Sequence, residues 1–125
     1  MKSTELEENL EAQIRLIFST KYILNCFSGG NEMQYIKFFK YPKIEKLMNN
    51  EEMMSSINQY LNNDLIISQT SRNAFMHRNT LIYRIHKFKK LTGLNVKKFR
   101  DAVLFNNMIY IKKFFDLKNI TDEKL

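Results

Sequence analysis

Apolar residues recur every three or four positions through most of the chain, which is the spacing that places them on one face of an α-helix. No segment alternates between apolar and polar residues for long enough to predict a β-strand. Only three glycines and one proline interrupt the 125 residues, so few positions favour a turn. The sequence therefore predicts an all-α fold. The expected helices cover residues 4–27, 32–40, 43–48, 51–61, 68–75, 78–91 and 98–115.

The first expected helix, 4–27, carries an apolar stripe along its length, which includes Ile14 and Ile17. Ser28-Gly29-Gly30-Asn31 is expected to end it, because glycine readily takes the positive φ of a helix C-terminus. A stripe of this kind is hard for a monomer to hide from water. We therefore expect residues 1–42 to form an N-terminal helical extension and a candidate dimerisation element.

Two of the expected helices, 68–75 and 78–91, are joined by a very short connection. Ser68 or Asp64 is a candidate cap for the first of them. The second has an apolar stripe for packing against its own domain, formed by Leu81, Ile85, Phe88 and Leu91. Two short helices with a tight turn between them describe a helix-turn-helix. Residues 43–116 are expected to form this domain, followed by a polar tail at 117–125.

Charge changes this picture, because it is distributed unevenly along the chain. Residues 65–115 contain eleven Lys or Arg and one acidic residue, Asp101. The preceding residues have seven basic and nine acidic side chains, and the following ones have two and three. The net charge of +7 thus divides into −2, +10 and −1. A basic block on a helical pattern favours binding to phosphates.

The second helix of the pair presents residue types that read and hold DNA. His77, Arg78 and Asn79 are placed to meet base edges, because the start of a recognition helix reaches deepest into the major groove. Arg bonds guanine bidentately, and Asn does the same with adenine. Hydroxyl and basic side chains further along reach phosphates. The candidate DNA-binding residues are Ser68, His77, Arg78, Asn79, Thr80, Tyr83, Arg84, Lys87 and Lys90.

One run of this block is recognisable. His77-Arg78-Asn79-Thr80-Leu81-Ile82-Tyr83-Arg84-Ile85, followed by Leu91-Thr92-Gly93-Leu94, resembles the C-terminal helix-turn-helix domain of the PucR/CdaR family of bacterial regulators, over about residues 43–115. The resemblance implies a sequence-specific double-stranded DNA-binding transcriptional regulator. We expect a homodimer, because one short helix reads too few base pairs for a specific site. We also expect a cytoplasmic protein at the nucleoid, without a cofactor.

The chain departs from that family in three respects. A basic residue is common at the position of Ile82, so one DNA contact of the family is expected to be missing. The family usually has Ala at the position of Ser71 and a large aliphatic residue at that of Ala74, so we expect Phe75 and Met76 to compensate in the packing. The family also normally carries a long N-terminal sensory region, which has no counterpart in the residues before 43. The chain is either a naturally short member, which the initial Met favours, or a fragment of a longer protein. No pocket signature names an effector.

Other readings remain open beside a specific regulator. One is a Fis-like architectural protein that binds DNA with low sequence specificity. Another is a protein-interaction module that pairs with a full-length regulator and binds no DNA alone. An enzyme is not expected, since no nucleophile–base or metal constellation is present. His77 and His86 lack Cys or carboxylate neighbours at ligand spacing, which predicts no metal site.

The remaining features favour ordinary structural roles. Cys26 is expected to be a small core residue, and a single cysteine excludes an internal disulfide. The aromatic residues Phe88, Phe99, Phe105 and Phe114 fall at helical spacing, so we expect core positions rather than an RNA-stacking surface. The chain starts without the apolar region of a signal peptide, and its apolar runs are far shorter than the ~20 residues that span a bilayer. We therefore expect no membrane association.

Overall fold

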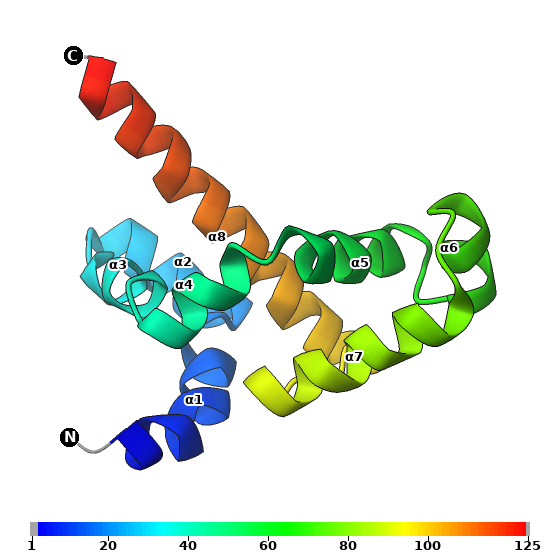
Figure 1. The fold of residues 1–125 in the computed structure, drawn as a ribbon. Coiled ribbons are helices and arrows are strands. Elements are labelled where there is room, and N and C mark those ends of the chain that lie inside the picture. The colour runs from blue at the N-terminus through cyan, green and yellow to red at the C-terminus, as the bar shows by residue number, and fades with distance from the viewer. Residues whose placement is uncertain (1–2, 125) are drawn as a thin grey trace.

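The computed structural model describes the backbone of residues 3–124 and the side chains of residues 9–118. This part of the chain forms eight α-helices and contains no strand (Figure 1). The all-α prediction is therefore confirmed. The helices are α1 Ser3–Ile17, α2 Thr20–Gly29, α3 Met33–Phe39, α4 Pro42–Met48, α5 Glu51–Asn62, α6 Ile67–Asn73, α7 Arg78–Thr92 and α8 Phe99–Lys124.

The last helix, α8, runs diagonally across the molecule and organises the rest (Figure 1). The N-terminal helices α1–α4 lie on one side of it, α5 and α6 lie on the other, and α7 runs past its N-terminal end towards α1. The C-terminal end of α8 extends beyond α3. The helix continues as far as Lys124, through most of the segment that the sequence analysis assigns to a polar tail.

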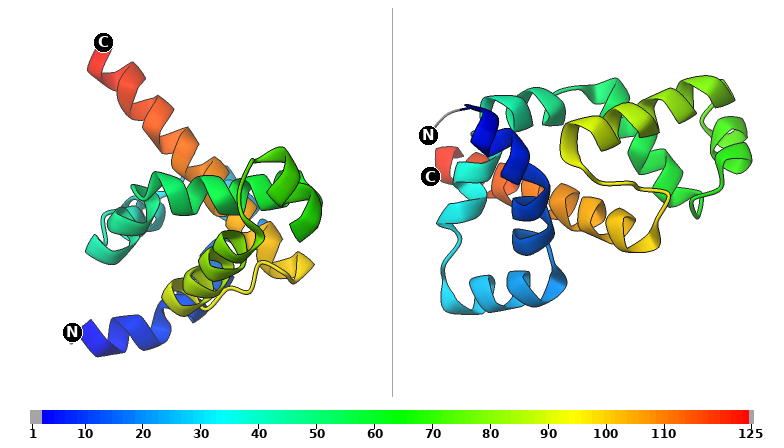
Figure 2. Two further views of the ribbon diagram at one scale, coloured as in Figure 1. Left: turned by 45° about the vertical axis from the view of Figure 1, so that its right-hand side comes forward. Right: turned by 90° about the horizontal axis from the view of Figure 1, so that it is seen from below.

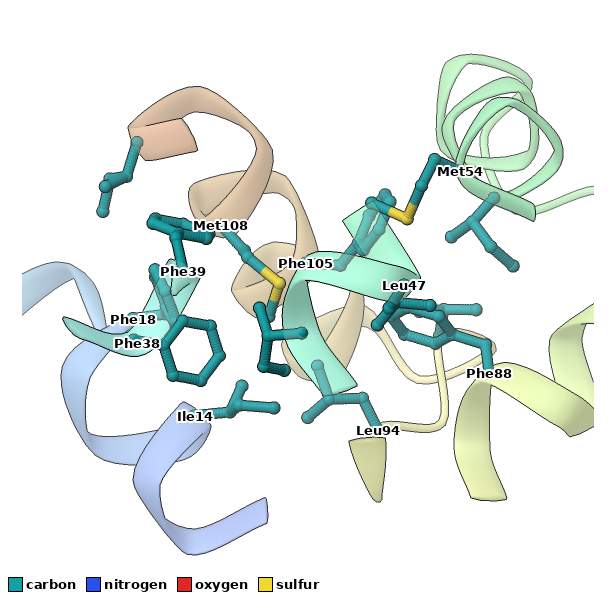
Figure 3. Packing of buried hydrophobic residues seen from close by; sticks show 14 of the residues in the cluster. Ile14, Phe18, Phe38, Phe39, Leu47, Met54, Phe88, Leu94, Phe105 and Met108 are labelled. Atoms are coloured by element: carbon teal, nitrogen blue, oxygen red, sulfur yellow. The ribbon is translucent and has the colours of Figure 1, made fainter. Parts of the chain in front are cut away.

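A single hydrophobic core joins the two sides (Figure 3). Ile14 of α1 and Phe18 lie in the same buried cluster as Phe88 of α7 and Phe105 of α8. The Phe88 and Phe105 rings meet edge to face, with centroids 5.2 Å apart. Each such side chain contributes about 1.5–3 kcal/mol by its burial. The N-terminal helices therefore share the core of the helix-turn-helix region.

The expected single helix over 4–27 is two helices, because Ser19 interrupts it. Ser19 has extended backbone angles, accepts from the Tyr22 N–H with its Oγ, and donates to the Leu16 carbonyl. A serine that takes the N-cap conformation starts a new helix and ends the previous one. α2 then closes at Gly30, which has φ 71°.

The middle of the N-terminal apolar stripe is covered by the chain's own helices. Ile14, Ile17 and Phe18 are buried in the core, and the Tyr35 hydroxyl donates to the Ile17 carbonyl at 2.6 Å. Leu24 of the stripe is exposed, and Leu6 lies outside the described side chains. A homodimer remains a prediction, but the buried part of this stripe is not free to form it.

Several expected core positions are confirmed, and others are wrong. Phe88, Phe105 and Cys26 are buried, whereas Phe99 is 73% exposed and Phe114 is 45% exposed. Leu91 is also exposed, and Thr92 takes the last buried position of α7 in its place. Leu91 is exposed because it lies to one side of the stripe of Leu81, Ile85 and Phe88, which Thr92 continues. Phe99 is the first residue of α8, where fewer neighbours cover a side chain.

Candidate nucleic-acid interface

The first helix of the pair, α6, starts without a side-chain cap, so the expected caps Ser68 and Asp64 are wrong. Its N-cap residue is Ile66, which has extended backbone angles. Asp64 and Leu65 both have positive φ, so they turn the chain away from α5. Thr70 is buried and donates to the Ile66 carbonyl at 2.7 Å, which secures the first turn from inside.

The turn between α6 and α7 is held by Ser71. Its Oγ donates to the Met76 carbonyl, and the Met76 N–H donates to the Ser71 carbonyl at 3.0 Å. Phe75, between them, has φ 50° and a side chain that is 97% exposed. Met76 packs against the core, whereas Phe75 does not, so only Met76 compensates as expected. The polar Ser71, which the family resemblance marks as a departure, fixes the turn.

The start of α7 is polar, exposed and free of negative charge. His77 is the N-cap, and its Nδ1 accepts from the Asn79 N–H at 3.1 Å. Arg78 and Asn79 are both exposed, and the first turn contains no acidic residue. The positive end of the helix dipole is therefore not neutralised, which favours an approaching phosphate.

The exposed face of α7 lies opposite its buried stripe. Leu81, Ile85 and Phe88 are almost completely buried, as predicted. Asn79, Tyr83, His86 and Lys90 recur at helical spacing on the other side and are exposed. This set is called the reading face below. Lys87 lies next to it, with Nζ 6.0 Å from the centroid of the Tyr83 ring. Ser68 is exposed on α6, and Thr80 is partly buried.

Arg84 is the candidate that the structure turns toward its own domain. Its Nη1 donates to Ser56 Oγ at 2.7 Å and its Nη2 to Glu52 Oε2 at 3.3 Å, so it ties α7 to α5. Its side chain is only 23% exposed. A guanidinium that is paired in this way holds the reading face in place, and this corrects the expectation of a free phosphate-binding side chain.

The far end of α7 is closed by Thr92, Gly93 and Leu94. Thr92 Oγ1 donates to the Phe88 carbonyl and accepts from the Leu94 N–H, at 2.8 and 3.1 Å. Gly93 has φ 80°, and a Cβ atom at this position would lie 2.6 Å from the Glu11 side chain. Glycine is therefore required twice, by the left-handed backbone and by the approach of α1.

Asp101, the one acidic residue between 65 and 115, is neutralised by the N-terminal part of the chain. Arg15 of α1 donates to both of its carboxylate oxygens, at 2.8 and 3.2 Å, and the Asn95 N–H donates to it at 2.8 Å. The Arg15 guanidinium holds the pKa of Asp101 below its ordinary value, and Asp101 raises that of Arg15. Sequence reasoning missed this pair, although Asp101 stands out as an isolated carboxylate.

Other kinds of site are not found in the described part of the chain. Its side chains form no group of three or more His, Cys, Asp or Glu that could hold a metal ion. Among the described residues, no helix is both long enough and apolar enough to cross a membrane. Cys26 is buried and accepts from Gln34 Nε2.

Residues 53–108 match the family model of the PucR C-terminal helix-turn-helix domain. This segment belongs to the PucR helix-turn-helix family. The family is of a DNA-binding type found in transcription regulators.

Three proteins of Bacillus subtilis (strain 168) are similar to the chain. The uncharacterized protein YsfB is 34% identical over 72 residues, which cover 58% of this chain and 20% of YsfB. The purine catabolism regulatory protein is 34% identical over 53 residues, 42% of this chain and 10% of that protein. The uncharacterized protein YxkF is 30% identical over 71 residues, 50% of this chain and 24% of YxkF. The chain thus spans a quarter or less of these relatives. No solved structure matches it significantly.

The PucR segment contains all the candidate DNA-binding residues, from Ser68 to Lys90. It begins within α5 and ends within α8, so α1–α4 lie outside it. Arg15 of α1 nevertheless donates a hydrogen bond to Asp101 of this segment, and the Glu11 side chain of α1 lies close to its Gly93. The N-terminal helices therefore support the PucR domain from outside the matched segment.

Proposed function

We propose that this chain binds specific sequences of double-stranded DNA as a bacterial transcriptional regulator, with α7 in the major groove. The observation that carries the proposal is the reading face of α7, which is exposed, polar and opposite a buried stripe in a PucR helix-turn-helix domain. A recognition helix needs both faces, one for its own core and one for the groove.

The contacts divide into two classes. Arg78 and Asn79, at the exposed start of α7, read base edges, because their side chains can bond guanine and adenine bidentately. The other candidates contact phosphates or flank the base contacts. They are Ser68 on α6, and His77, Thr80, Tyr83, Lys87 and Lys90 at the start of α7 or along it. Phosphate contacts fix the register of the helix, whereas base contacts give the specificity.

We further propose that the chain acts as a homodimer in the cytoplasm, where the bacterial chromosome lies. One short helix reads too few base pairs for a specific site, and paired half-sites solve this problem. The relative named as a purine catabolism regulatory protein supports a regulatory role for the chain. In keeping with the sequence analysis, residues 1–42 form an extension to a helix-turn-helix unit at 43–116.

The experiment that tests the function is selection of DNA from a random duplex pool by the purified protein at near-physiological salt. We expect a two-fold symmetric motif with half-sites ~34–36 Å apart, about one turn of DNA. The Arg78→Ala variant is the control, because it should enrich a motif that is degenerate at one position of each half-site.

The other outcomes distinguish the other readings. Retention of DNA without an enriched motif contradicts specific recognition and supports a Fis-like architectural protein. Retention of no DNA contradicts the proposal altogether and supports a protein-interaction module. A motif without symmetry contradicts the homodimer alone.

A further inference from the structure

We propose that a basic concavity at the C-terminal end of α7 binds a phosphate of the DNA backbone, as a second anchoring point beyond the reading face. This inference rests on the proposed DNA-binding function and names a site that the sequence does not reveal. Four of its polar residues, His86, Lys89, Asn95 and Lys97, are absent from the candidate set.

The concavity has a volume of about 380 Å³ and lies between the second half of α7 and the linker to α8. Figure 2 (right) shows this linker running back along α7 before α8 begins. The lining includes no carboxylate, and it brings three lysines together with an imidazole and an amide. The lining residues are Ile85, His86, Lys89, Lys90, Asn95 and Lys97.

The backbone on the linker side of the concavity is anchored, so the point from which the Lys97 side chain starts is fixed before any ligand arrives. Leu94 and Val96 are completely buried and anchor the linker on both sides of Asn95. Asn95 donates its N–H to Asp101, and its Oδ1 accepts from the Lys97 N–H at 3.2 Å. Because the backbone is fixed, binding of a phosphate costs little conformational entropy beyond that of the lysine side chains.

The charge of the concavity depends on Arg15. Asp101 lies directly behind the linker, hydrogen-bonded to Asn95, and its carboxylate would oppose a phosphate. The bidentate contact from Arg15, whose guanidinium also pairs with the exposed carboxylate of Glu11, offsets that charge. Arg15 is therefore a positioning residue, which keeps both the shape and the positive potential of the site without contacting the ligand.

The occupant is a backbone phosphate because the concavity adjoins the reading face. His86 and Lys90 belong to both surfaces. α7 has 15 residues and is therefore ~22 Å long, whereas the major groove is ~12 Å wide. When the start of α7 lies in the groove, its far end reaches the sugar–phosphate edge.

The test is the salt dependence of DNA binding by a Lys89→Gln/Lys97→Gln variant. The probe is a fluorescein-labelled duplex recovered from the random pool, and binding is followed by anisotropy between ~50 and 200 mM salt. We expect the slope of log K against log salt to become shallower by about one, since the concavity holds one phosphate and each lost phosphate contact removes ~0.9. The preference for the selected duplex over a scrambled one should not change.

Two further variants make the result specific. Lys21→Gln/Lys37→Gln removes the same charge from exposed positions on α2 and α3, and it should leave the slope within half a unit of the parent, because these lysines are far from α7. Arg15→Gln should weaken binding severalfold, because Asp101 then opposes the phosphate. Thermal unfolding by circular dichroism checks that each variant is folded.

The possible failures are distinguishable from one another. If the Lys89→Gln/Lys97→Gln slope equals that of the parent while Arg78→Ala still changes base preference, the concavity is not a phosphate site, although the proposed function stands. If that slope is unchanged and millimolar inorganic phosphate shifts the Asn95 amide resonance, the concavity binds a free anion instead, which also overturns the inference. If the parent binds no DNA, the proposed function fails, and this inference fails with it.

Discussion

The two ends of α7 are built in different ways. At the start, His77 caps the helix through Asn79, and Ser71 holds the turn through Met76, so these two contacts are within a few residues. At the far end, the linker is fixed by Asp101, and Asp101 is held by Arg15, 86 residues away in sequence. The end that reads DNA is therefore local, whereas the end that anchors the helix depends on the N-terminal helices.

This difference means that the DNA specificity of α7 and the anchoring of α7 in the protein depend on different residues. Changes near the start of α7 should alter which DNA is bound. Changes in α1 or around Gly93 should alter how firmly the helix is held and how strongly it attracts phosphates. The predictions below test this division, beginning with a residue on which both ends depend.

The largest effect is expected for Leu81→Ala, because Leu81 lies in the middle of the buried stripe and is completely buried. Removal of its side chain leaves a cavity between α7 and the core, which should lower the free energy of unfolding by ~2–5 kcal/mol. Urea denaturation followed by circular dichroism measures this. Tyr83→Ala on the exposed face is the matched control and should change stability by less than ~0.5 kcal/mol. A Leu81→Ala protein as stable as the parent would contradict the register of α7.

The next effect concerns the local end. Arg78→Ala should lower affinity for the selected duplex by ~1–3 kcal/mol and relax the preference at one base position, because Arg78 is exposed at the start of α7. Binding to a set of duplexes with single base changes measures both quantities. An equal loss for every duplex would instead identify Arg78 as a phosphate contact, and specificity would then not reside at this end.

The sequence predicts the local end much better than the distant one. Leu81, Ile85 and Phe88 share a helical period, and His77-Arg78-Asn79 stands directly before it, so the helix and its exposed start follow from neighbours in the chain. The same reasoning wrongly places Arg84 among the DNA contacts. It cannot detect the partners of Arg84, because Ser56 and Glu52 lie 28 and 32 residues earlier in the chain. Periodicity gives the direction of a side chain, and the tertiary fold decides what it meets.

The break at Ser19 and the pair of Arg15 with Asp101 show two kinds of missed information. Ser19 carries a local signal, since serine followed by threonine is typical of a helix start, but the apolar stripe across it suggests one continuous helix. Arg15 and Asp101 carry no local signal, because their contact exists only after α1 has packed against α7 and α8.

A third prediction tests the distant end through Gly93. Gly93→Ala places a Cβ atom against the Glu11 side chain at a residue with φ 80°, and it should destabilise the protein by ~1–3 kcal/mol. Gly29→Ala is the matched control, since no atom lies within 4 Å of its added Cβ, and it should be neutral or slightly stabilising. Equal stability of the two variants in urea would show that α1 does not constrain this end.

A fourth prediction uses pH to separate the distant end from the local one. Because Arg15 lowers the pKa of Asp101 in the folded protein, the pair stabilises the fold fully above the ordinary Asp value of ~3.9. This contribution is lost as the pH falls below that value and through the lowered pKa. Urea midpoints measured between pH 6 and pH 2 should therefore decrease less in Asp101→Asn than in the parent. Parallel curves for the two proteins would mean that the pair contributes nothing to stability.

The smallest effect is expected at the local end, at Phe75. Its side chain is almost entirely exposed and its φ is 50°, so Phe75→Ala should change stability by less than ~0.5 kcal/mol. Phe75→Gly should be slightly more stable than Phe75→Ala, by under ~1 kcal/mol, because glycine adopts positive φ without strain. Measurement of both variants in urea and on the selected duplex separates two roles of the ring. Unchanged DNA affinity would make Phe75 a turn residue only. A loss of affinity that is common to both variants, with stability preserved, would add the ring to the DNA contacts at the local end of α7, and the reading surface would then begin in the turn before the helix.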